Sequence, residues 1–217
     1  MELYKQITYK GHHINIYYDA DPKSPRKWDN LGTFYTSHPN YRPEEDFYRH
    51  FEREEVFDRY GDFQDSFEKK YIALKIYLYD HSGLAISSGP FACPWDSGLF
   101  GMVAVSIEKV KKEYGWKKIT AARRRKIESY LQGEIDAYDQ YLRGEIYGYR
   151  ITLEDNDDEV LDSCWGFFGD EGIEEIKAEG RATIDALVTD SKKQEWEERL
   201  RISGPELPFS EFALSTI

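Results

Sequence analysis

The fold is decided by the stretch Tyr71-Ile72-Ala73-Leu74-Lys75-Ile76-Tyr77-Leu78-Tyr79, which shows the clearest alternation in the chain. Every second side chain is a large aliphatic one, so these side chains share one face of an extended strand. The next four residues, Asp80-His81-Ser82-Gly83, have the composition of a tight turn, and the apolar run Leu84–Ser87 follows. The segment therefore predicts a β-hairpin with one buried face.

Further strands and helices are expected on both sides of this hairpin. The same alternation predicts strands at residues 3–9, 14–18, 100–105, 146–153 and 160–168. Apolar residues at helical spacing predict helices at residues 43–60, 107–114, 120–142 and 171–188. No repeat or linker separates these elements. We therefore expect a single α+β domain over residues 1–217, with residues 190–217 as a peripheral helix or tail. Its mainly antiparallel sheet would have five to seven strands, with helices packed on one side.

The composition indicates a cytoplasmic protein. Hydrophobic residues make up 40% of the 217 residues, enough for a sizeable core. No apolar run is long enough to span a membrane, and the start of the chain lacks the features of a signal peptide. Cys93 and Cys164 have no zinc-site spacing and are expected to be buried thiols, with a single disulfide or a reactive thiol as the alternatives. No metal or cofactor is expected.

The charge is distributed unevenly along the chain. Residues 109–126 contain nine basic side chains and one acidic one, which gives this segment +8 within a chain of net charge −12. Four of the basic residues, Arg123, Arg124, Arg125 and Lys126, fall in the first two turns of a predicted helix, where positive charge opposes the helix dipole. Two explanations are open: pairing with carboxylates of the acidic body, or binding of phosphate in a nucleotide or nucleic acid.

Several loops place a carboxylate beside small turn residues. If the loops converge, Asp80, His81 and Asp96 would form a polar pocket together with Asp29, and His81 would act as a general base. The expected binding residues around it are Trp28, Asp29, Asn30, Trp95, Asp96 and Trp165. The alternative is ordinary turn chemistry, because tight turns also require Asp, Ser and Gly. A thiolate pair of Cys93 with His81 is disfavoured by the apolar neighbours of the cysteine. The acidic run 155–159 lacks the pattern of a calcium loop and is expected to be a solvated hairpin tip.

Five motifs occur in a fixed order along residues 28–169. They are Trp28-Asp29-Asn30-Leu31-Gly32-Thr33, Tyr79-Asp80-His81-Ser82-Gly83, Cys93-Pro94-Trp95-Asp96-Ser97-Gly98, Tyr138-Asp139-Gln140-Tyr141-Leu142 and Asp162-Ser163-Cys164-Trp165-Gly166-Phe167. In these motifs the chain resembles a family of uncharacterised proteins carried by bacteriophages and other mobile elements. It departs from the family at residues 36–41, where relatives would carry more arginine, so no phosphate role of that loop is implied. The resemblance implies an accessory protein that acts in the host cytoplasm against a defence system such as CRISPR or restriction. It implies no catalytic residues.

Three functional hypotheses follow. The first is a non-enzymatic protein whose acidic surface attracts a host protein, such as a nucleic-acid-binding defence effector, and inhibits it. The second is a small hydrolase or nucleotide-processing enzyme that uses Asp80, His81 and Asp96. The third is a nucleic-acid or nucleotide binder that uses the basic strip 109–126. None of them involves a membrane.

Overall fold

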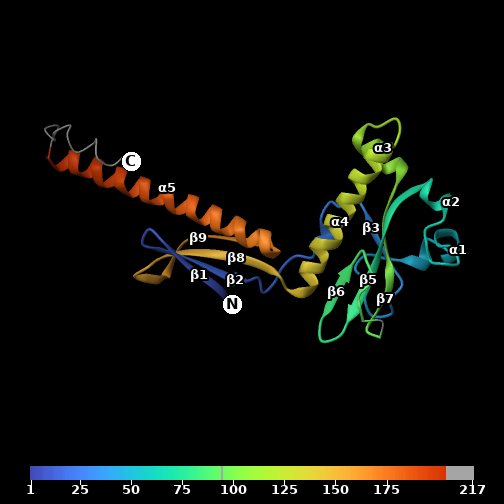
Figure 1. The fold of residues 1–217 in the computed structure, drawn as a ribbon. Helices are drawn as coiled ribbons and strands as arrows, with labels where there is room; N and C mark the ends of the chain where they lie inside the picture. The colour runs from blue at the N-terminus through green and yellow to red at the C-terminus, as the bar shows by residue number, and fades with distance from the viewer. Residues whose placement is uncertain (94, 204–217) are drawn as a thin grey trace. The chain divides into compact units, whose positions relative to one another are not determined.

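The computed structural model describes residues 1–93 and 95–203, and the chain divides into two compact units. The central unit comprises residues 19–146, and the terminal unit joins residues 1–18 to residues from 147 onward. Both contain strands and helices (Figure 1), so the predicted α+β class is confirmed. The strands are shared between two sheets of four and five strands in the described part of the chain. Whether the two units fold as one domain depends on whether they unfold together, and the expectation of a single domain stays a prediction.

The sheet of the central unit has the strand order β4-β3-β7-β5-β6. Its strands are β3 (Thr33–Thr36), β4 (Glu45–Asp46), β5 (Tyr71–Asp80), β6 (Leu84–Ser87) and β7 (Ser97–Ser106). The pairing is antiparallel except between β3 and β4. The predicted hairpin is present as β5 and β6, with Leu78 opposite Ile86. The alternation in β5 buries Ile72 and Ile76 completely, as expected for its apolar face.

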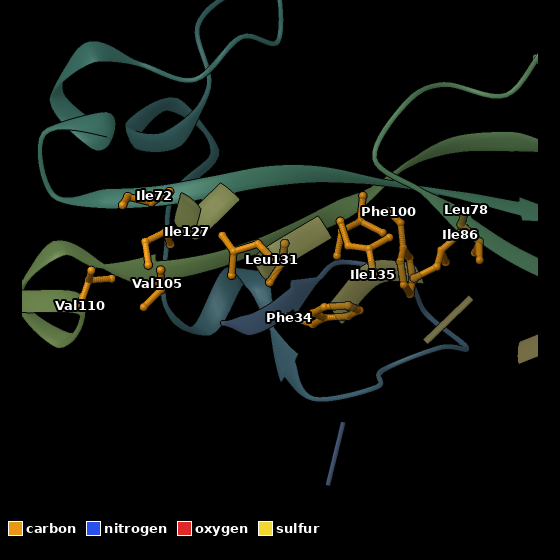
Figure 2. Packing of buried hydrophobic residues seen from close by; sticks show 12 residues of the cluster. Phe34, Ile72, Leu78, Ile86, Phe100, Val105, Val110, Ile127, Leu131 and Ile135 are labelled. Atoms are coloured by element: carbon orange, nitrogen blue, oxygen red, sulfur yellow. The ribbon is translucent and has the colours of Figure 1, made fainter. Parts of the chain in front are cut away.

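The long helix α4 (Ala121–Arg143) covers one face of this sheet. Thr120 caps its start by accepting a hydrogen bond from the Arg123 backbone N–H, and Gly144 ends it in the left-handed conformation. Three side chains at helical spacing, Ile127, Leu131 and Ile135, are fully buried against the strands (Figure 2). The shorter helix α3 (Ile107–Tyr114) adds Val110 to the same core. The helices predicted at residues 107–114 and 120–142 are thus confirmed to within one residue.

The opposite face of the central sheet is covered by short helical segments. The helix predicted over residues 43–60 is wrong, because this stretch contains β4, the 3₁₀ turn η2 (Phe47–Arg49) and a single turn of helix, α1 (Arg53–Val56). Glu52 is extended between the two turns, which lets Phe47 and Phe57 reach a second core. Helix α2 (Asp65–Glu68) adds Phe67 to it, beside Met102 of β7. Acidic and aromatic residues at helical spacing therefore serve here to cover a sheet.

The terminal unit is a four-stranded sheet with one helix packed on it. Its strands are β1 (Leu3–Tyr9), β2 (His12–Tyr18), β8 (Ile146–Leu153) and β9 (Asn156–Phe168), in the order β1-β2-β8-β9. Helix α5 (Gly169–Ser203) buries Ile176 and Ile184 against Ile14, Tyr149 and other side chains of the sheet. It continues through residues 190–203, and residues 204–217 lie outside the described residues. A search of the described helices found none with the length and apolar character of a membrane span.

Candidate functional site

The turn after β5 and the start of β7 bring part of the predicted Asp/His pocket together. The backbone N–H of Asp80 donates to the backbone oxygen of Asp96 at 2.9 Å, which fixes the two loops to each other. His81 Nδ1 lies 3.6 Å from Asp96 Oδ2, and Cys93 Sγ donates to the same oxygen at 3.3 Å. Because the carboxylate lies between thiol and imidazole, His81 does not contact the proton of Cys93. The arrangement differs from a nucleophile–base pair, in which the base contacts the nucleophile directly.

The third predicted catalytic residue, Asp80, does not join this pair. Burial, followed by the charge of the nearby Asp80 carboxylate, raises the pKa of Tyr41. No hydrogen bond or ion pair joins the Asp80 side chain to His81 or Asp96 among the described residues. The structure thus pairs His81 with Asp96 and leaves Asp80 outside the pair. Beside the pair, a cavity of about 490 Å³ is lined by mostly apolar residues together with His81 and Cys93. Cys93 is only half-buried, and its thiol contacts the Asp96 carboxylate. The apolar surroundings expected from its neighbours in the sequence are therefore only partly present.

The three tryptophans do not share one pocket. Trp28 and Trp95 line different cavities of the central unit. Trp165 belongs to β9 in the terminal unit, where its ring lies against Gly148, and a Cβ atom at Gly148 would come within 2.1 Å of the indole. The motif Asp162–Phe167 is therefore part of the terminal sheet. Cys164 is free and half-buried, as Cys93 is, so the expectation of buried reduced thiols holds in part.

The loop of Trp28-Asp29-Asn30 is held by a buried arginine that sequence analysis missed. The side chain of Arg26 is 1% exposed and pairs with both Glu44 and Glu134, at 2.7 and 3.0 Å. Its Nη2 also donates to the Gly32 oxygen at 2.8 Å. The other oxygen of Glu134 accepts the backbone N–H groups of Leu31 and Gly32. The loop is thus fixed to α4, and nothing local in the sequence distinguishes Arg26 from an exposed arginine.

The basic strip lies on α3, on the turn that follows it and on the start of α4. We call its nine cations the basic patch: Lys109, Lys111, Lys112, Lys117, Lys118, Arg123, Arg124, Arg125 and Lys126. None of them makes an ion pair with a described carboxylate, whereas seven of the other 20 lysines and arginines do. Pairing with the acidic body, one of the two explanations considered for these charges, is therefore not found. Arg123 and Arg124 donate instead to backbone carbonyls of Lys118 and Glu68, at 2.8 and 2.6 Å.

Aromatic rings are interleaved with the basic patch. Tyr114 stacks on Trp116 with ring centroids 4.6 Å apart, and its ring is nearly parallel to that of Tyr130 at 6.4 Å. The Arg123 guanidinium lies 4.7 Å from the Trp116 ring, and Lys126 Nζ lies 5.7 Å from the Tyr130 ring. Burial, followed by the neighbouring Tyr130, raises the pKa of Tyr114, so its hydroxyl stays protonated at neutral pH. Cations alternating with ring faces are typical of surfaces that bind single-stranded nucleic acid.

The basic patch and the Trp28-Asp29-Asn30 loop meet. Lys109 Nζ donates to the backbone oxygens of Asn30 and Leu31, at 3.2 and 2.8 Å. Between loop and helix lies a cavity of about 300 Å³, which we call the aromatic cavity. It is lined by Pro25, Trp28, Asp29, Asn30, Leu31, Tyr114, Tyr130, Gly133, Glu134 and Ala137. Two of the regions predicted from sequence as separate binding candidates thus form one surface, without the Asp/His pocket.

The described residues offer no metal site. No group of three or more His, Cys, Asp or Glu side chains is placed to hold an ion in this part of the chain. Asp157, from the acidic run expected as a hairpin tip, lies at the start of β9, where its carboxylate bonds His13 and Thr152 at 2.9 and 2.8 Å. The bond from His13, and then that from Thr152, lowers the pKa of Asp157. This carboxylate therefore connects the start of β9 to β2 and β8.

Comparisons with protein-family models, with curated proteins and with solved structures found no match to this chain. The resemblance to phage-borne and mobile-element proteins stays a prediction.

Proposed function

We propose that the central unit binds nucleic acid through the basic patch. The observation that carries the proposal is the absence of ion pairs between any of the nine cations and the described carboxylates, in a chain that has 12 more acidic than basic side chains. If these nine cations served only the fold, some of them would be expected to have carboxylate partners, as seven of the other 20 lysines and arginines do. Cations without such partners are able to contact phosphate oxygens, and each such interaction releases counterions from the nucleic acid.

The net negative charge of the chain does not prevent phosphate groups from binding at the basic patch. The basic patch contributes +9 to a central unit whose residues sum to −2, so most of the acidic charge lies elsewhere on the unit. At physiological ionic strength the Debye length is about 8 Å, and charges beyond that distance are largely screened. A phosphate at the patch therefore interacts mainly with the local cations.

The test is fluorescence anisotropy with a labelled oligonucleotide at a series of salt concentrations. With about four to six phosphates neutralised on a single strand, log K should fall against log salt with a slope of about −3 to −4. The double substitution Arg125→Glu/Lys126→Glu should weaken binding and make the slope shallower by about 0.7 for each phosphate that is no longer neutralised. Its matched control is Lys192→Glu/Lys193→Glu, because this pair is also adjacent, exposed and helical, and gives the same change in charge. Equal losses in both variants, or no binding at low salt, would contradict the proposal.

The inhibitor hypothesis remains a second proposal, favoured by a different observation. Of the 39 described carboxylate side chains, 28 make no ion pair. Such acidic side chains suit a basic groove on another protein. The resemblance to phage-borne and mobile-element proteins suggests that this other protein is a host defence effector. The test is recovery of one basic host protein that nucleic acid displaces, at low and at physiological salt. If the recovered protein stays bound when nucleic acid is added, it is not held by its nucleic-acid groove.

The enzyme hypothesis has the least support. It requires Asp80, His81 and Asp96 to act together, but among the described residues only His81 and Asp96 are paired. His81 is 64% exposed, and its one ion pair among the described residues is the 3.6 Å approach to Asp96, which leaves its ring loosely positioned. The paired residues beside the cavity of about 490 Å³ would suit a small ligand better than a proton-transfer chain.

A further inference from the structure

The aromatic cavity has the size and walls for one ring system. Its volume of about 300 Å³ is at the lower end of the range of ligand pockets, about 300–1,000 Å³. Tyr130 lines the cavity and is 45% exposed, and the Tyr114 ring, also on the wall, lies nearly parallel to it. Every nucleobase has a π-face that stacks on such rings.

The polar groups around the cavity differ in whether their hydrogen-bond donors and acceptors already have partners. Both Glu134 oxygens are occupied, one by the backbone N–H groups of Leu31 and Gly32 and the other by Arg26. The Asn30 amide nitrogen is occupied by the carbonyls of Pro25 and Trp28. The Asp29 carboxylate, by contrast, is exposed and has no hydrogen-bond partner among the described residues. It is therefore an acceptor for the N–H groups on the edge of a base.

Gly133 lies on the cavity wall and places no side chain in the space. It lies in the middle of α4, where glycine destabilises a helix by about 1 kcal/mol relative to alanine. A Cβ atom there would meet nothing within 4 Å, and the residue has no left-handed backbone conformation that would require glycine. Packing and backbone geometry therefore do not require a glycine here. Because the residue lies on the cavity wall, a large side chain at this position would extend into the space, whereas a small one leaves it open.

The cations next to the cavity fix the kind of ligand. Lys126 lies beside the Tyr130 ring, and Lys109 contacts the loop that forms the opposite wall. A group bound in the cavity is thus flanked by phosphate-binding side chains. We propose that the aromatic cavity holds one unpaired nucleobase of a strand whose phosphates contact the basic patch. This inference rests on the proposed function and adds to it a preference for single strands.

The test compares two labelled oligonucleotides of equal length, one with all its bases and one in which the nucleotides are abasic. Both carry the same phosphates, so the difference in affinity measures the interactions of the bases alone. Stacking of one base should make the strand with bases bind about 5- to 100-fold more tightly. Gly133→Leu, which places a bulky side chain in the cavity, should remove this difference and leave the binding of the abasic strand, which depends on the phosphates, unchanged. Gly133→Ala adds a single methyl group and is the matched control, which should keep the preference and stabilise the helix.

The outcomes separate this inference from the proposed function. If the wild-type protein binds both strands equally, or if Gly133→Leu keeps the preference for bases, the cavity holds no base while the phosphate binding stands. If neither strand binds, the proposed function fails and the inference fails with it. A nucleoside monophosphate forms the third arm of the experiment. If the nucleoside monophosphate binds at least as tightly as the strand, the cavity is a site for free nucleotides. The proposal that it holds a base of a strand then fails.

Discussion

Replacing Arg26 by methionine tests whether the loop of the aromatic cavity is built as described. Methionine keeps much of the length and the apolar stem of the side chain but removes the guanidinium. Four hydrogen bonds disappear, of which three go to carboxylates and one to the Gly32 carbonyl. The packing of the guanidinium on the Phe34 ring, 3.9 Å from its centroid, disappears as well.

The size of the effect follows from what the two carboxylates retain. Breaking a buried ion pair by removing one partner costs about 3–5 kcal/mol, because a buried charge is left without compensation. Glu134 keeps the N–H groups of Leu31 and Gly32, and Glu44 keeps that of Phe34. We therefore expect Arg26→Met to lower the free energy of unfolding by about 3 kcal/mol, the lower end of this range. This is a large part of the total stability of a typical domain, about 5–15 kcal/mol.

The assay is urea unfolding followed by circular dichroism, with nucleic-acid binding measured on the folded protein. With an m-value of about 1–3 kcal/mol/M, a loss of this size lowers the midpoint by about 1–3 M. The triple variant Arg26→Met/Glu44→Gln/Glu134→Gln should recover part of the loss, because it leaves no unpaired charge. A loss below about 1 kcal/mol in the single variant, or a triple variant no more stable than the single one, would refute the reasoning.

Three further predictions concern other parts of the fold. Gly148→Ala should destabilise the terminal unit by about 1–3 kcal/mol in urea unfolding, because its methyl group displaces the Trp165 ring. Gly101→Ala should prevent β3 and β7 from pairing, seen as a loss of strand signal in circular dichroism, since its Cβ would lie 2.0 Å from a backbone oxygen of β3. The bond between Lys10 and Asp185 lowers the pKa of the acid and raises that of the base. Its stabilisation is therefore present from about pH 4 to about pH 10, lost as pH falls through the lowered pKa and lost as pH rises through the raised one. Lys10→Met should accordingly lower the unfolding midpoint at pH 7, and its difference from the wild-type protein should shrink as the pH falls below about 4 through the lowered pKa of Asp185.

Local patterns predicted the elements whose burial is periodic. The alternation of residues 71–79 predicted β5, and the spacing of Ile127, Leu131 and Ile135 predicted α4, because each element buries one continuous face. The segment 43–60 failed for the opposite reason. Phe47 and Phe57 pack on the far face of the sheet from separate turns, so long-range packing and not helical periodicity sets their spacing.

The sequence predicted individual parts of the candidate site but grouped them incorrectly. Sequence analysis identified the Trp28-Asp29-Asn30 loop and the cations of residues 123–126 but grouped the loop with the Asp/His turn. Lys109 bonds the loop across 78 and 79 residues of chain, and no local signal reports such an interaction. Arg26 escaped notice because a buried arginine is recognised only by partners distant in sequence, here Glu44 and Glu134.

Two departures from ordinary helix chemistry occur at the same part of α4. The helix has no acidic residue in its first turn, whereas α3 begins with Glu108 and α5 with Asp170 and Glu171. Further along α4, after its last clustered cation, comes Gly133, in a position where alanine would fit and stabilise. Neither feature stabilises the folded state, and both border the aromatic cavity or the basic patch beside it. Because residues that conflict with local stability are expected at functional sites, their coincidence supports this surface over the Asp/His pocket, whose residues have the composition of ordinary turns.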